Sequence, residues 1–328
     1  MKMKSNILTV IIVMTFLLCL SCGDNVSKTP KAIGSNIEGV GIPVIYETDM
    51  TLDVDDVGAL AVLHGLQMEK KVNLLGVCYN EVHPAGPAVI DAINTYYGYG
   101  TLPIGIYQKQ LADPDPSDYF SLERDFDVDN MAHDPMDNIV GNAVGVYKSL
   151  LKDQPDSSVT IVSVGFLNNL YELLQDKEGY SLVEKKVKLL AIMGGLHNDG
   201  FNLVRHDLVE QSQYVIENWP GKLVTTHVGG DMITGETLTS TTPINNPVRR
   251  SYELEWYQGP HIGRSSWDEV TVLYAVYGTD YYVEEWEGSG NLRNGYTWSF
   301  KKGHRGYAAP KDDSQVEKEI ERLMTLVP

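Results

Sequence analysis

The sequence predicts an α/β fold with a mostly parallel sheet flanked by helices. Short apolar runs alternate along the chain with segments of helical periodicity, which is the pattern of successive βαβ units. Acidic and amide side chains follow several of the apolar runs, and in parallel sheets ligands collect at the carboxyl ends of the strands. A length of 328 residues with 43% hydrophobic content is enough for one large domain.

The individual elements follow from local pattern. The expected strands are the apolar runs 44–46, 72–77, 159–164, 188–193 and 223–226. The expected helices are 57–67, 88–97, 142–151, 167–174, 208–218 and 270–277. Segment 288–310 is rich in Gly, Asn, Trp and Tyr and suggests a hairpin. Ser314 and Glu317 have the spacing of a capping box, which predicts a final helix.

The N-terminal residues are expected to be a processing signal. A basic start precedes the apolar run 7–20, which is short for a membrane span, and Ser21-Cys22 follows it directly. We therefore expect a lipoprotein-type signal peptide over 1–22 with Cys22 lipidated; the alternative is an ordinary cleaved signal. Polar residues 23–39 then form a flexible tether, and 40–328 a single domain. The protein would be exported and held at the cell envelope, in the periplasm or on the cell surface.

Charge and cysteine content exclude several classes of partner and of fold. The formal net charge is −18, which repels phosphate backbones, so nucleic acid is not an expected partner. A small neutral or cationic ligand is compatible with such a surface. After processing at Cys22, Cys78 is the remaining cysteine, so no disulfide framework forms within one chain. Cys78 lies in an apolar stretch and is expected to be a buried small hydrophobe.

A cluster of carboxylates follows the first expected strand. Glu47, Asp49, Asp53, Asp55 and Asp56 fall within ten residues, immediately before a helix. Close carboxylates repel one another, and a hard cation such as Ca²⁺ or Mg²⁺ relieves that repulsion. The alternative is a solvated acidic loop with a helix-capping Asp. The spacing is not that of an EF-hand, which needs a Gly at its sixth position and an acid at its twelfth.

Four stretches in order resemble the inosine-uridine-type nucleoside hydrolases. The acidic segment from Glu47 to Asp56 is similar to their N-terminal fingerprint, with Glu for the first Asp and two extra residues before Asp55-Asp56. The other three stretches are Ser163–Leu170, Met193-Gly194-Gly195 with Asn202 downstream, and Ser266-Trp267-Asp268. Together they span 42–280. The resemblance implies the Rossmann-like fold of that family and hydrolysis of N-ribosides.

The resemblance also implies a metal site and a base. Ca²⁺ would be held by Asp49, Asp56, the backbone carbonyl of Val164 and Asp268. Asp49 would orient or deprotonate the attacking water. Nearby carboxylates would stabilise the positive charge that develops on the sugar in the transition state.

Sugar contacts are implied at further positions. Asp55 and Asn202 would bind ribose hydroxyls, with either Asn80 or His83 as a remaining contact and Asn198 as a weaker candidate. Asp53 lies in the two-residue expansion, where it could be an additional ligand or support one.

The chain departs from the family pattern at two informative positions. Gly200 replaces a Glu that contacts ribose. Trp267 stands where pyrimidine-tolerant members carry a His that protonates the leaving base. An indole cannot supply that proton but can stack on a purine; the alternative is a packing aromatic. Among the remaining histidines, His197 and His261 are better candidates for the pocket than the others, although a position outside it is the alternative for each.

The expected function is therefore Ca²⁺-dependent hydrolysis of ribonucleosides, with some purine preference, in purine salvage. One alternative is hydrolysis of another ribosyl or glycosyl compound, motivated by Gly200. A second is a lipoprotein that binds a sugar or nucleoside without cleaving it. A small-molecule substrate is the expected partner, membrane contact would be only through the lipid anchor, and a homo-oligomer is a further expectation.

Overall fold

The computed structural model describes residues 41–51, 53–114, 140–254 and 262–328, which belong to one compact unit. The predicted signal peptide, its Cys22 and the tether lie outside these residues. In the described part of the chain, no helix has the length and apolar content needed to span a bilayer.

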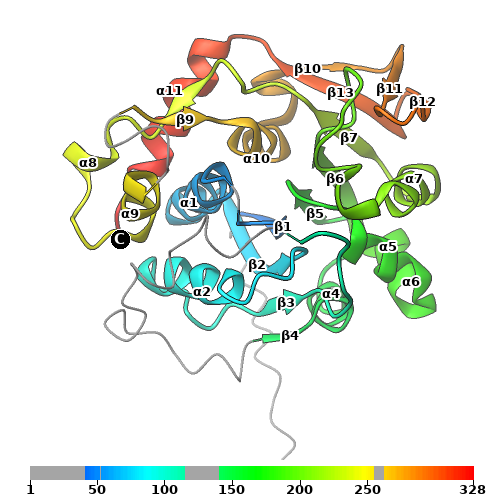
Figure 1. Cartoon of the computed structure of the whole chain (residues 1–328), viewed down its shortest axis with the longest axis horizontal. Helices are drawn as coiled ribbons and strands as arrows, with labels where there is room; N and C mark the ends of the chain where they lie inside the picture. Colours follow the sequence, from blue (N-terminus) through cyan, green and yellow to red (C-terminus); the bar gives the residue numbers. More distant parts are fainter. Residues whose placement is uncertain (1–40, 52, 115–139, 255–261) are drawn as a thin grey trace, which may run out of the picture. The chain divides into compact units, whose positions relative to one another are not determined.

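A nine-stranded sheet forms the centre of the unit, in the order β10-β13-β7-β6-β5-β1-β2-β3-β4 (Figure 1). Among these strands only β10 runs antiparallel to its neighbour. Its strands are β1 (Ile42–Thr48), β2 (Val72–Tyr79), β3 (Ile104–Ile106), β4 (Val140–Asn142), β5 (Val159–Ser163), β6 (Val187–Met193), β7 (Leu223–Thr226), β10 (Tyr282–Glu285) and β13 (Arg305–Pro310). The predicted α/β class with a mostly parallel sheet is confirmed.

Helices cover both faces of this sheet. They are α1 (Asp55–Met68), α2 (Gly86–Tyr96), α4 (Ala143–Lys152), α5 (Asn168–Gln175), α6 (Lys177–Lys186), α7 (Val209–Asn218), α8 (Leu238–Thr241), α9 (Pro247–Leu254), α10 (Trp267–Tyr277) and α11 (Asp313–Met324). In Figure 1, α1, α2, α10 and α11 lie on one side of the sheet and α4 to α7 on the other.

Alternation along β1 creates these two layers, because successive side chains of a strand point to opposite faces. Val44 and Tyr46 pack in one core cluster with residues of α1, α10 and α11. Ile45 packs in a second cluster with residues of α4, α5 and α7. β1 is buried on both faces and lies in the middle of the sheet, so the loop after it emerges at the centre of the sheet's carboxyl edge.

Two expectations for the C-terminal part are wrong in detail. The hairpin of 288–310 is limited to β11 (Ser289–Asn291) and β12 (Thr297–Ser299), because the following residues join the main sheet as β13, parallel to β7. The final helix is capped by Asp312, whose carboxylate accepts a hydrogen bond from the Gln315 N–H at 3.1 Å. Ser314 therefore lies inside the helix rather than at its cap.

Candidate active site

Three carboxylates from the first turns of two helices meet at the carboxyl edge of the sheet. Asp55 and Asp56 begin α1, and Asp268 lies in the first turn of α10, which packs alongside α1. One ligand oxygen from each lies within 4.8 Å of the other two, and all three residues are buried. We call Asp55, Asp56 and Asp268 the acidic floor. Residues far apart in the sequence therefore form one compact group of oxygen donors.

Burial and mutual repulsion raise the pKa values of the three carboxyl groups of the acidic floor. Desolvation is the largest cause that raises the pKa of each of its carboxyls well above the usual value. Neighbouring carboxylates add to this effect, Asp53 for Asp55 and Asp49 for Asp56. The N-terminal ends of both helices offset part of the repulsion.

The donor set of the acidic floor fits a hard cation. Asp56 accepts a hydrogen bond from the Thr48 hydroxyl, whereas the buried Oδ1 of Asp268 has no partner among the described residues. A bound cation would satisfy that oxygen and neutralise part of the charge. Ca²⁺ and Mg²⁺ prefer such all-oxygen sets. The arrangement therefore suits a metal cofactor.

A cavity of about 330 Å³ opens above the acidic floor. Most of the predicted site residues line it: Asp49, Asp55, Asp56, Val164, Asn202, Trp267 and Asp268. The structure groups Asp55, expected at the sugar, most tightly with the metal candidates Asp56 and Asp268. The Val164 carbonyl, expected as a metal ligand, accepts a hydrogen bond from the Asn202 side-chain amide. The Oδ1 of Asn202 is buried and has no partner among the described residues.

The other three predicted contacts do not line this cavity. The amide nitrogen of Asn80 donates to the Phe166 carbonyl at 2.8 Å, and the Nδ1 of His83 accepts from the Ala85 N–H at 3.1 Å. Asn198 is exposed, and its backbone N–H donates to Asn291. Local hydrogen bonds hold these residues, and their contacts with a sugar stay a prediction.

Aromatic and cationic residues also line the cavity, and of these only Trp267 was predicted from the sequence. We call Trp267, His227, Phe201, Arg205 and Arg264 the aromatic wall. The Arg264 guanidinium lies 5.4 Å from the Trp267 ring, and that of Arg205 lies 4.6 Å from the Phe201 ring. Such cation–π contacts hold both partners in place.

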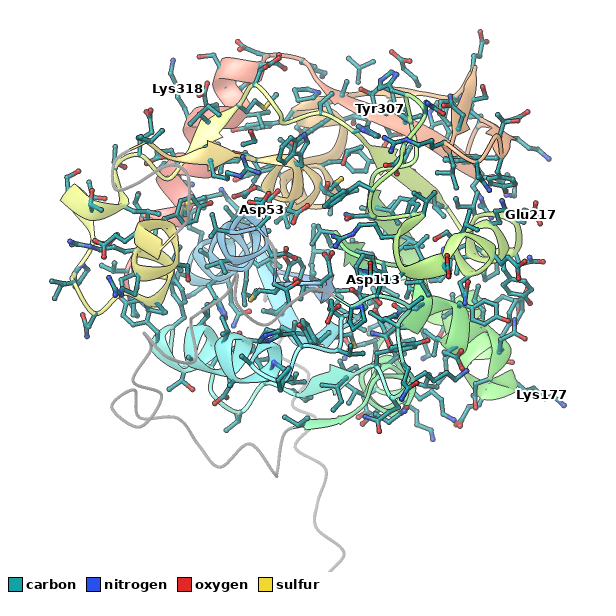
Figure 2. The ribbon with its side chains drawn as sticks, viewed as in Figure 1. Asp53, Asp113, Lys177, Glu217, Tyr307 and Lys318 are labelled. Carbon is teal, nitrogen blue, oxygen red and sulfur yellow. The ribbon has the colours of Figure 1, made fainter. Side chains whose placement is uncertain are left out.

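Asp53 and Asp199 shape the rim of the site. Asp53, labelled in Figure 2, lies beside the start of α1. Arg264 forms two hydrogen bonds to its carboxylate, at 2.8 and 2.6 Å, so Asp53 supports the aromatic wall. Asp199 accepts hydrogen bonds from the Gly195 and Phe201 N–H groups, both at 2.8 Å, and so fixes the loop after β6.

Of the two histidines singled out from the sequence, one is not in the cavity and the other is not described. His227 lines it, whereas His197 is exposed and does not; His261 lies outside the described residues. Only the position of His227 directly after the strand 223–226 could have indicated it.

No protein-family model matches the chain, and no curated protein matches it either. Several solved structures do match it in fold. The inosine-uridine preferring nucleoside hydrolase from Bacillus anthracis has a TM-score of 0.65 at 15% identity, over 87% of this chain and 99% of that one. An inosine-guanosine nucleoside hydrolase has a TM-score of 0.65 at 13% identity, over 88% and 100%. The type III effector XopQ, solved with adenosine diphosphate ribose, has a TM-score of 0.61 at 14% identity, over 87% and 94%. The fold of this chain is therefore that of the nucleoside hydrolases.

Proposed function

We propose that this protein hydrolyses the N-glycosidic bond of ribonucleosides with the help of Ca²⁺, and that it prefers purines. The observation that carries the proposal is the acidic floor, a buried set of oxygen donors beneath a cavity with an aromatic side. The similarity in fold to proteins described as nucleoside hydrolases supports it.

The residues that would hold the cation are Asp56 and Asp268, with Asp49, Asp55 and the Val164 carbonyl at the same cavity. When bound, Ca²⁺ supplies a template and local positive charge for the attacking water. Asn202 must then release the Val164 carbonyl, which frees its amide for a ribose hydroxyl.

The chemistry requires one bond to form and one to break at the anomeric carbon. Asp49 accepts a proton from the attacking water as the new C–O bond forms. The C–N bond breaks, its electron pair leaves with the base, and the base takes up a proton. Asp55 and Asn202 bind ribose hydroxyls, and the carboxylates stabilise the oxocarbenium-like transition state. Trp267 stacks on the departing purine.

Location is part of the proposal. The signal-like residues 1–22 and Cys22 support export and attachment to the envelope by lipid, where the enzyme would feed nucleoside salvage.

The test uses the full-length chain with inosine, guanosine, adenosine and uridine, and follows ribose release with and without a chelator. We expect purine cleavage that is lost on chelation and in Asp49→Ala. If none of the four releases ribose while Ca²⁺ is still bound, the proposal is overturned.

A second candidate substrate is a phosphorylated riboside. Gly200 removes the acidic residue expected at the sugar, and a Cβ there would lie 2.1 Å from the Arg293 guanidinium. Arg205 lines the cavity nearby. The missing acid and the presence of Arg205 make the cavity more favourable to an anion. Faster cleavage of nucleoside 5′-monophosphates or ADP-ribose than of nucleosides would favour this candidate.

A further inference from the structure

The departing base needs a hydrogen-bond donor, and Trp267 does not supply a transferable proton. The base departs with an electron pair, and a hydrogen-bond donor that meets the developing negative charge accelerates this step. The indole of Trp267 is held under Arg264 and offers a stacking face rather than a transferable proton. Another group of the aromatic wall must therefore supply a donor if the protein is to meet this requirement.

His227 lies on the same side of the cavity as Trp267. It follows β7 directly, and the next residues pack against Trp267. Gly229 has a φ of +125°, and a Cβ there would lie 2.7 Å from the Trp267 backbone nitrogen. A Cβ on Gly230 would lie 3.3 Å from the indole Nε1. These close approaches make the segment that carries His227 and the start of α10 one continuous surface.

Backbone contacts fix which nitrogen of His227 carries the proton. The Leu196 N–H donates to the Nδ1 of His227 at 3.1 Å, so Nδ1 is the acceptor of the ring. The proton of the neutral imidazole is then on Nε2. Desolvation, the largest cause, lowers the pKa of His227, the neighbouring His197 lowers it further, and Asp199 opposes them. The ring is therefore neutral near pH 7.

We propose that the Nε2–H of His227 donates a hydrogen bond to the departing nucleobase. This inference rests on the proposed function and assigns the residue that assists the leaving group. His227 keeps its proton, and the proton that the base gains comes from the water consumed in the reaction. The substrate class that benefits has an acceptor nitrogen or oxygen on the base near the scissile bond, as purine and pyrimidine nucleosides have.

Two isosteric substitutions separate this role from a structural one. In His227→Asn the side-chain oxygen takes the place of Nδ1 and keeps the contact with Leu196, but the Nε2 donor is lost. In His227→Gln the amide reaches the place of Nε2, and the contact with Leu196 is lost. His197→Asn is the control, because His197 is exposed, outside the cavity lining, and packs edge-on against His227 with ring centroids 5.6 Å apart.

The measurement is kcat/KM for inosine and for p-nitrophenyl β-D-ribofuranoside, whose leaving group needs no donor. We expect His227→Asn to lower the value for inosine about 100-fold and the value for the nitrophenyl riboside less than about threefold. His227→Gln should retain more inosine activity than His227→Asn, and His197→Asn should leave both substrates unchanged.

Several outcomes would overturn the inference. If His227→Asn retains inosine cleavage while His227→Gln loses it, His227 only supports the Leu196 loop. If both substrates fall equally in His227→Asn, the residue acts on the fold or on the sugar. Failure of the proposed function looks different, because the unsubstituted protein would then cleave neither riboside.

Discussion

The acidic floor and the aromatic wall line the same cavity but differ in how their charges are balanced. The floor gathers buried carboxylates that repel one another, so it costs folding stability until a cation is bound. In the wall, each arginine lies against an aromatic ring, and Arg264 also pairs with Asp53. The difference teaches that the floor depends on a ligand for its charge balance, whereas the arginines of the wall find their partners within the chain.

Removing one carboxylate of the floor should have the largest effect. We expect Asp268→Asn to lower kcat/KM for inosine about 1,000-fold, because several kcal/mol of transition-state stabilisation depend on the cation. The same change should raise the Tm of the chelated protein by roughly 2–4 °C, since one repelling charge is gone. Activity assays and thermal unfolding measure the two effects. Asp153→Asn, at an exposed acid, is the control and should change neither.

The pH dependence of stability should reverse when the cation is bound. The raised pKa values of the floor stabilise the chelated protein fully at low pH, and this contribution is lost as the pH rises from about 4 through the raised folded values. Ca²⁺ binds the deprotonated carboxylates, so its effect grows with pH. At 100-fold excess over Kd it should add about 2.7 kcal/mol, or several degrees in Tm.

Thermal unfolding at pH 5 and pH 8, with chelator or with Ca²⁺, checks this prediction. The chelated protein should be less stable at pH 8, and the gain from Ca²⁺ should be larger there. An equal gain at both pH values would mean that the floor does not hold the ion.

A substitution in the aromatic wall should weaken contacts with the base without changing the affinity for Ca²⁺. We expect Trp267→Ala to lower kcat/KM for inosine about tenfold, because stacking on one base contributes on the order of 1–3 kcal/mol. Trp267→Phe should lose less. Calorimetric titration should give the same Kd for Ca²⁺ in both variants, and a weaker Kd would show that wall and floor are not separable.

The ion pair at the rim should have the smallest effect. The Arg264 and Asp53 side chains are each about a quarter exposed, so Arg264→Gln should cost about 1 kcal/mol in urea unfolding. We expect less than about a fivefold change in kcat/KM. Lys222→Gln breaks a remote pair with Glu284 of similar exposure and is the matched control. A similar stability loss with unchanged activity is expected there.

The fold and the acids at the start of α1 could be predicted from local sequence signals, whereas Asp268 followed only from the resemblance to a family. Apolar runs identified β1, β2, β5, β6 and β7, and the carboxylates of β1 and α1 are close together in the chain. The short strands β3 and β4 were missed, because each has only three residues. Apart from Trp267, the wall could not be predicted, since His227 and Arg205 belong to no motif and only the packing of the loops after β6 and β7 brings them to the same cavity.

The bond between Arg264 and Asp53 joins positions 211 residues apart. During synthesis, Asp53, Asp55 and Asp56 are made early, whereas their partners Arg264 and Asp268 belong to the last fifth of the chain. A nascent or C-terminally shortened polypeptide therefore carries the acids without Asp268 or Arg264. The three acids of the floor can therefore come together only when translation has nearly finished.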